Sequence, residues 1–345
     1  MNLGDKMKKW LSYIVDIVKE EYKFIAILII LYIIFQIPVN YYIITGGGTS
    51  DISSRIHVKD AYSKKGTFNI SYVEELKGTV FSYALSYIIP TWERENADLY
   101  KYSKKESIED IEFRSDLDLK TANGNAIYWA YKLANKRFTQ KSAELYVITT
   151  FEEYKTTLKT KDRILNIDGN TYETIKEYKD YLQTKKENDT VKITIIRNKK
   201  EKQITAKLYK YKKKNILGVA LQYAKTYETK PPVKIKFKSS ESGPSGGLIT
   251  TLEIYNQLTK KDITKGLKIA GTGTIEEDGT IGQIGGVEHK ILGAESDKTD
   301  IFLVPSGENY KAALKYKKQK KLKIKIIEVK NIQDALKKLE KLKWD

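Results

Sequence analysis

Cysteine is absent from this chain of 345 residues, and histidine occurs only as His57 and His289. Without cysteine there are no disulfides, no thiol nucleophile and no thiolate metal site. Two histidines are too few for a multi-histidine centre, so we expect no bound metal. The chain is still long enough for two or three domains, each with its own hydrophobic core.

Arginine is scarce: it supplies six of the 62 basic residues, so the net charge of +18 comes mainly from lysine. Such a charge alone indicates nucleic acid or an anionic surface as partner. Proteins that bind nucleic acid favour the planar guanidinium, however. Residues 311–345 hold 13 lysines against four acids, which is half of the excess, and these lysines alternate with apolar residues as on solvated faces. We therefore predict no nucleic-acid partner.

Charge is missing altogether from the 21 residues between Phe24 and Ile44. That length suits a transmembrane helix, which needs roughly 20 apolar residues. A buried core helix is the alternative, but it would keep a polar stripe, and residues 25–35 have none. No small-residue cleavage site is found after it, which favours a retained signal anchor over a cleaved signal peptide. The lysines among residues 6–23 indicate that the N-terminus is cytoplasmic. We therefore predict a cytoplasmic tail of residues 1–23, a single transmembrane span of residues 24–44, and a remainder that lies outside the cell membrane.

The glycine-rich stretch 46–50 predicts a flexible exit from the membrane. Residues 45–140 then form an extracytoplasmic α/β region, with a strand expected over 67–73 and helices over 80–89 and 119–133. We identify no chemistry in this region.

Residues 141–215 have the pattern of a small β-rich module. Apolar and polar residues alternate over 191–195 and 204–208, a turn is expected at 198–199, and residues 175–182 have helical spacing. The segment that begins with "LKTKDRILNIDG" and ends with "ITAKL" resembles the second half of a bacterial PDZ domain. That resemblance implies a peptide bound as an added strand. In such domains a glycine-containing loop binds the terminal carboxylate of the peptide, and the matching residues here are 142–145, which include the acidic Glu144. Because an acid disfavours a bound carboxylate, the module could instead bind internal segments or serve only as structural support.

The glycines between 266 and 293 do not form a nucleotide site. Gly271-Thr272-Gly273 is followed by Thr274, Ile275 and Glu276, and no G-x-x-x-x-G-K-[ST] motif occurs in the chain. We therefore predict no cofactor and no ATPase activity.

Ser245 is the candidate nucleophile, because it stands between Gly243-Pro244 and Gly246-Gly247 at the start of an expected helix. A helix N-terminus offers free backbone N–H groups that stabilise an oxyanion. The alternative is a serine that caps the helix. The hydroxyl also needs a base, and Lys290, among apolar neighbours at the start of another expected helix, qualifies if burial lowers its pKa.

The stretch from "SGPSGG" to "IGGVEHKILGA" resembles the proteolytic domain of Lon-type serine peptidases. The resemblance implies Ser245 as nucleophile, Lys290 as base, Thr272 as the residue that orients the base, and Pro244 and Gly246 in the oxyanion region. The departures are small and lie at Gly246, Gln283 and His289. The order of anchor, PDZ-like module and Lon-type domain is that of membrane-anchored proteases of Gram-positive-type bacteria.

We accordingly expect an α+β multidomain chain with a transmembrane helix, a PDZ-like module, and a Lon-type domain over 216–345 of the ribosomal-protein-S5-domain-2-like kind. The expected function is a membrane-anchored, ATP-independent, extracytoplasmic serine endopeptidase that acts on secreted peptides or membrane-protein ectodomains. Two alternatives stay open: His289 as the base, and a catalytically inactive, membrane-tethered PDZ protein that binds peptides. The sequence predicts no oligomeric state.

Overall fold

The computed structural model describes residues 3–238 and 241–342. The chain forms two compact units, one from residues up to Gly46 with Glu74–Leu99, and one from Gly47–Val73 with the chain from Tyr100 onward. The region predicted over 45–140 is thus divided, since its residues 74–99 group with the N-terminal helix. The ends of the predicted tail and of the predicted peptidase domain, residues 1–2 and 343–345, lie outside the described residues.

The first unit contains the long helix α1 (Leu3–Gln36), which has a kink at Glu21, and the short helix α2 (Val80–Leu85). Its strands are β4 (Glu93–Asn96) and the first part of β1 (Pro38–Asp51), which pair antiparallel over residues 41–44 and 93–96. A capping box at Thr79 begins α2, because its hydroxyl accepts the Ser82 N–H and the Ser82 hydroxyl accepts the Thr79 N–H.

The structure does not contain the transmembrane helix predicted over 24–44. No helix among residues 3–238 and 241–342 is long and apolar enough to cross a membrane. Helix α1 ends at Gln36, and the chain from Pro38 onward joins β1. The uncharged helical part, residues 24–36, is about 20 Å long at 1.5 Å per residue, whereas the hydrocarbon core of a bilayer measures about 30 Å.

The remaining elements are β2 (Ile56–Val58), β3 (Thr67–Thr79), η1 (Ala97–Tyr100), α3 (Ile108–Leu133), β5 (Arg137–Thr150), β6 (Arg163–Ile167), α4 (Ile175–Gln183), β7 (Thr190–Arg197), β8 (Lys200–Lys207), β9 (Tyr209–Tyr211), β10 (Lys214–Ile216), β11 (Val219–Lys230), β12 (Val233–Ile235), α5 (Gly247–Leu258), β13 (Lys268–Gly271), α6 (Val287–Ser296), β14 (Ile301–Pro305), α7 (Glu308–Lys320), β15 (Lys325–Val329) and α8 (Ile332–Lys341).

The β-rich module of the second unit is an antiparallel sheet in the order β11-β5-β6-β7-β8. Val191, Ile193 and Ile195 all face one core together with Tyr178 and Leu182 of α4, as the alternating pattern predicts. The sheet reaches beyond the predicted limits of 141–215. It begins at the start of β5 and takes in β11, which pairs with β5 along its length.

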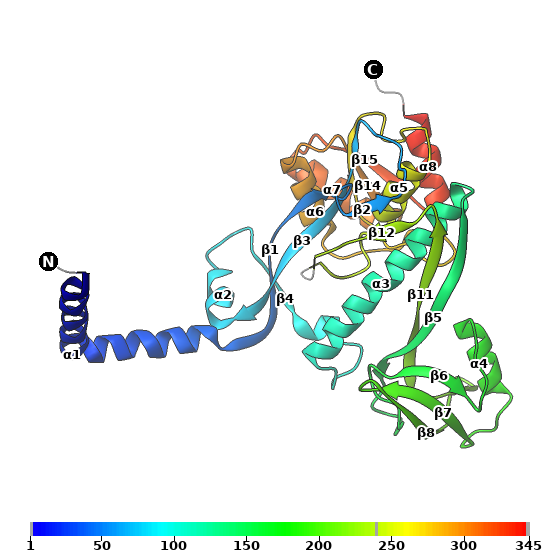
Figure 1. The fold of residues 1–345 in the computed structure, drawn as a ribbon, viewed down its shortest axis with the longest axis horizontal. Helices are drawn as coiled ribbons and strands as arrows, with labels where there is room; N and C mark the ends of the chain where they lie inside the picture. The colour runs from blue at the N-terminus through cyan, green and yellow to red at the C-terminus, as the bar shows by residue number, and fades with distance from the viewer. Residues whose placement is uncertain (1–2, 239–240, 343–345) are drawn as a thin grey trace. The chain divides into compact units, whose positions relative to one another are not determined.

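The C-terminal part of the second unit is a three-layer structure around the parallel strands β15-β14-β13-β3, with β1 next to β3. On β13 and β14, Ile269, Ile301 and Leu303 face the core that holds α3, α5 and α8. Ala270 and Phe302 face the opposite core, which holds α6 and α7 (Figure 1). Helices cover both faces, which explains the unbroken apolar run of β14. The predicted α+β class is confirmed.

Helix α3 connects the β-rich module to this C-terminal part, because it packs against both β11 and α5 (Figure 1). The contact with β11 is close at Gly124, where a side-chain Cβ would come within 2.3 Å of the Lys225 carbonyl oxygen. A residue larger than glycine would push helix and strand apart.

Candidate active site

Ser245 lies at the N-terminal end of α5, as the glycine-flanked motif predicts. Gly243 adopts a left-handed conformation (φ +82°) and donates its N–H to the Ser115 carbonyl at 3.2 Å. The Pro244 carbonyl accepts the Gly247 N–H at 3.1 Å, which closes a turn around the serine. Ser245 therefore precedes the N-cap residue, Gly246, and is not itself the cap.

Lys290 lies in the first turn of α6, whose N-cap residue Gly286 has a left-handed backbone (φ +65°). The Lys290 N–H donates to the Gly286 carbonyl at 3.1 Å. Only 3 % of Lys290 is exposed, and its helix neighbours Val287 and Ile291 are buried in the same core. This lysine therefore has surroundings unlike those of the exposed lysines of α7.

The two helices bring Ser245 and Lys290 together at the carboxyl end of β13. Lys290 Nζ lies 3.0 Å from Ser245 Oγ and 3.2 Å from Thr272 Oγ1. Thr272 follows β13 directly and is fully buried. Its hydroxyl donates to the Ser245 carbonyl at 3.2 Å, and the Gly273 N–H donates to the same carbonyl at 2.8 Å. Thr272 thus bonds to the backbone of Ser245 and to the side chain of Lys290.

Burial lowers the pKa of Lys290 to about 8. Desolvation is the cause, because removal from water disfavours the ammonium form. Over the described ranges 3–238 and 241–342, no carboxylate forms an ion pair with Lys290 that would oppose this shift. About a tenth of the side chain is then neutral at pH 7, and about half at pH 8.

Of the two residues predicted in the oxyanion region, Pro244 and Gly246, only Gly246 has a backbone N–H that could bind an oxyanion. Pro244 has no backbone N–H and contributes only its carbonyl to the turn. In the described part of the chain, the N–H groups of Ser245 and Gly246 meet no protein acceptor. Both lie at the positive end of the α5 dipole. A Cβ at Gly246 would meet the terminal methyl group of Ile70, so this side chain would have to move to admit a larger residue.

The histidines do not replace Lys290 in this geometry. His289 precedes Lys290 on α6, so its side chain leaves the helix about 100° away from that of Lys290. His57 lies in β2, where it is paired with Lys234 of β12.

The comparison of residues 142–145 with a carboxylate-binding loop is wrong. They lie inside β5, paired with β11, and the Glu144 carboxylate binds Lys120 and Arg163. The edge strand beside α4 is β11 instead, and the chain enters it through Gly218, which has φ +70°. The sequence signal was present as Leu217-Gly218-Val219, but it lies after the predicted end of the module.

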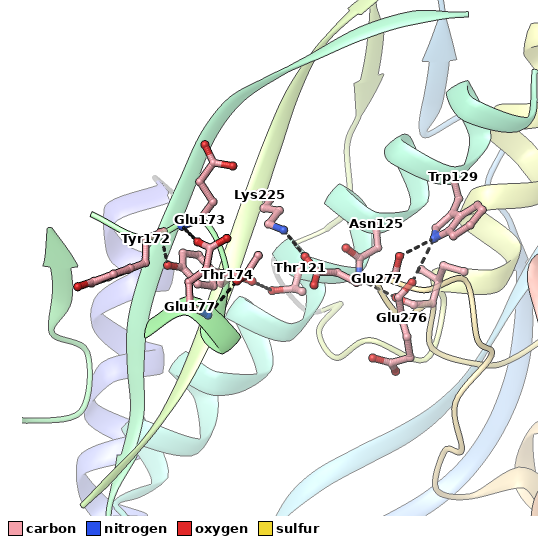
Figure 2. A network of polar contacts seen from close by, with 12 residues as sticks. Thr121, Asn125, Trp129, Tyr172, Glu173, Thr174, Glu177, Lys225, Glu276 and Glu277 are labelled. Carbon is pink, nitrogen blue, oxygen red and sulfur yellow. Dashed lines mark hydrogen bonds and ion pairs between the residues drawn. The ribbon is translucent and has the colours of Figure 1, made fainter. Parts of the chain in front are cut away.

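The second unit contains a cavity of about 660 Å³. Nothing in the sequence had indicated it. Residues from five separate segments line it, among them Pro244, the residue before the nucleophile. Figure 2 shows Asn125 and Trp129 of α3 pointing toward the segment of Glu276 and Glu277, and Lys225 of β11 pointing toward Glu277. Trp129 Nε1 donates to the Glu276 carbonyl at 3.2 Å, which fixes this segment beside α3.

Two family models match parts of the chain. Residues 137–208 match the PDZ domain, and residues 234–341 match the Lon protease (S16) C-terminal proteolytic domain. A curated relative, the Lon protease of Aster yellows witches'-broom phytoplasma (strain AYWB), is 33% identical over 95 residues. That match covers 28% of this chain and 12% of the relative. The C-terminal match and this relative support a serine peptidase.

Among solved structures, the chain is similar to the PDZ domain of the SdrC-like protein from Listeria monocytogenes, with 31% identity and a TM-score of 0.21 over 22% of this chain and 85% of that chain. The PDZ domain of the SdrC-like protein from Listeria innocua shows 29% identity and a TM-score of 0.22 over 23% of this chain and 92% of that chain.

Proposed function

We propose that the chain is a serine endopeptidase that hydrolyses peptide bonds with a dyad of Ser245 and Lys290. One observation carries the proposal: the buried Lys290 Nζ lies 3.0 Å from Ser245 Oγ. A base must be within hydrogen-bond reach of the proton that it removes and must have a pKa near the working pH, and Lys290 meets both conditions.

In the proposed reaction, neutral Lys290 accepts the Ser245 hydroxyl proton while Oγ attacks the carbonyl carbon of the substrate. The N–H groups of Ser245 and Gly246 hold the negative charge that develops on the carbonyl oxygen. Lys290 then returns the proton to the leaving amine, and an acyl ester remains on Ser245. Water hydrolyses the ester by the same proton transfers in reverse order. Thr272 holds Nζ in line for both transfers.

Hydrolysis without ATP is part of the proposal. It is supported by the sequence, in which no phosphate-binding loop motif occurs.

We propose that the PDZ-like module presents the substrate. The edge strand β11 lies beside α4, and an extended segment could pair with such an edge as an added strand. The Glu144 carboxylate forms ion pairs with Lys120 and Arg163. It therefore gives no reason to prefer an internal segment over a terminal carboxylate as the bound part of the substrate.

Attachment of the chain to a membrane stays a proposal too, and so does a location of the peptidase domain outside the cytoplasm. The attachment is supported by the apolar half of α1, where residues 27–34 are all exposed. Eight consecutive residues cover the whole circumference of a helix, so no face of this segment is polar. Exposed apolar surface of this kind marks contact with lipid or with another protein.

Digestion of β-casein, an unfolded protein, tests the proposed chemistry. We expect the full chain to cleave it and Ser245→Ala and Lys290→Met each to abolish cleavage, whereas His289→Ala keeps most of it. A catalytically inactive peptide-binding protein would cleave nothing and would not react with a peptidyl phosphonate that labels active serines.

A further inference from the structure

The cavity near the nucleophile is lined from four directions. Helix α3 contributes Asp118, Thr121 and Asn125, the start of α4 contributes residues 174–176, and β11 contributes residues 221–223 and 225. Pro244 and residues 274–277 complete the wall from the peptidase side. The PDZ-like module, α3 and the segment next to Ser245 therefore border one space, and this space begins one residue from the nucleophile.

The basic side chains in the wall already have acidic partners. Lys225 forms an ion pair with Glu277, and Lys176 lies 2.6 Å from Asp180. An anion in the cavity would have to share these ammonium groups with the carboxylates that they already bind.

Two carboxylates in the wall have only neutral hydrogen-bond donors among the residues 3–238 and 241–342. Asp118 accepts the Gln222 side-chain N–H at 2.9 Å, and Glu276 accepts the Thr274 hydroxyl at 2.5 Å. Arg114, one turn before Asp118 on α3, attracts it, but its guanidinium is bonded to Glu106 and to the Tyr100 carbonyl.

Asp118 of α3 and Glu276 of the segment 274–277 both line the cavity, and their negative charges repel each other. Burial, with a smaller contribution from Glu276, raises the pKa of Asp118. A cation placed between the two carboxylates would remove this repulsion and would compensate for the desolvation of Asp118.

We propose that this cavity is a substrate subsite of the peptidase and that it accepts a lysine or arginine side chain of the substrate between Asp118 and Glu276. The inference rests on the proposed function and adds a substrate class to it. Asp118 and Glu276 would then determine specificity, while Gln222 fixes the Asp118 carboxylate from the PDZ-like module. The aliphatic part of the side chain would lie against Ile175, Leu221 and Ile275.

The test begins with β-casein and the full chain. Mass spectrometry of the digest locates the bonds that are cut, and we expect lysine or arginine to be enriched at one fixed position relative to them. A synthetic peptide spanning the most frequently cut bond is then compared with a version in which norleucine replaces that basic residue. We expect kcat/KM to be about fivefold higher for the basic peptide, as one partly buried charge interaction would give.

Asp118→Asn and Glu276→Gln, separately and together, should reduce this ratio toward one, because they lower kcat/KM for the basic peptide more than for the norleucine peptide. Glu308→Gln is the matched control, because it removes an exposed carboxylate from α7, and it should keep the ratio. Cleavage that depends on Ser245 but shows no basic preference, or a preference that survives in the double variant, would overturn this inference alone. Absence of Ser245-dependent cleavage would overturn the proposed function and the inference with it.

Discussion

At the scale of residues, the site depends on a lysine that is kept from water. Lys290 is almost fully buried beside the apolar residues Val287 and Ile291, and its ammonium group is hydrogen-bonded to the hydroxyls of Ser245 and Thr272. Neutral hydroxyls do not stabilise an ammonium as a carboxylate would, so desolvation prevails and the pKa falls to about 8. The neighbour His289 could have been preferred on residue type alone, but the helix directs it elsewhere.

The hydroxyl of Thr272 has a testable role. Thr272→Val keeps the shape of the buried side chain but removes its bonds to Lys290 and to the Ser245 carbonyl. We expect kcat to fall by about tenfold, the effect of one lost hydrogen bond in the transition state. Thr272→Ser, which retains the hydroxyl, should restore most of kcat in the same steady-state assay. Equal losses in both variants would show that Thr272 acts only through packing.

The stability of the fold should depend on pH through Glu253, a buried residue of α5 outside the dyad. Burial raises its pKa to about 7, against 4.5 for an exposed glutamate. The folded state therefore binds the proton more tightly, so this contribution to stability is full below pH 4.5 and is lost as the pH rises through 7. Glu253→Gln keeps an oxygen for the Gln257 amide and removes the titration.

Between pH 5 and pH 8 we expect the wild type to lose about 2 kcal/mol of unfolding free energy relative to Glu253→Gln. Urea unfolding of both proteins at the two pH values measures this difference. Parallel changes in the two proteins would contradict the assignment.

At the scale of elements, two helix N-termini from opposite faces of the parallel sheet place the dyad. Helix α5 belongs to one core and α6 to the other, and both begin near the carboxyl end of β13. Both starts have glycine as the N-cap residue, in different surroundings. A side chain at Gly246 would displace the end of the Ile70 side chain, whereas Gly286 has a left-handed backbone that favours glycine.

Gly286→Ala tests the second start. Alanine at φ +65° is strained by about 1 kcal/mol, and its Cβ would also lie 3.0 Å from Val73 Cγ1. We expect a lower melting temperature and a lower kcat, because the strain falls on the helix that carries Lys290. Gly285→Ala is the matched control, since a Cβ there meets nothing within 4 Å and its φ is not left-handed. Equal effects of both substitutions would argue against a special role of the left-handed start.

Local motifs predicted the positions of Ser245 and Lys290 at helix starts, and their role as a catalytic dyad stays a prediction. Ser245 and Lys290 each stand at a helix start that glycines mark in the sequence, and Thr272 directly follows a short strand. The edge strand β11 and the subsite at Asp118 could not be predicted in this way. Asp118 meets Glu276 only after α3 packs along α5 and β11, and neither residue belongs to a motif.

At the scale of the whole molecule, hydropathy alone placed the end of the N-terminal helix too far along the chain, at Ile44 instead of Gln36. The uncharged run continues to Ile44, but its last residues have strand partners in β4, so tertiary pairing prevails over the helical tendency of an apolar run. What remains is a shorter helical segment that is apolar all round and exposed.

Vesicle binding tests the proposed role of that segment. We expect the wild type to sediment with uncharged phosphatidylcholine vesicles, and Ile30→Lys with Ile33→Lys to lose most of this binding, because each lysine places a charge among apolar side chains that are 56% and 58% exposed. Val18→Lys, in the charged half of α1, is the control. Undiminished sedimentation of the double variant would contradict attachment through this segment.

Activation of Ser245 by Lys290 as the base underlies the whole proposed function. The rate at which a peptidyl diphenyl phosphonate labels Ser245, measured from pH 6 to pH 10, tests it without any need to know the substrate. The rate should rise about tenfold per pH unit and level off above pH 8, as the neutral lysine accumulates. Lys290→Met should be labelled slowly at every pH, and His289→Ala should follow the wild-type curve. Fast labelling of Lys290→Met, or a curve that changes with His289→Ala, would contradict the role of Lys290.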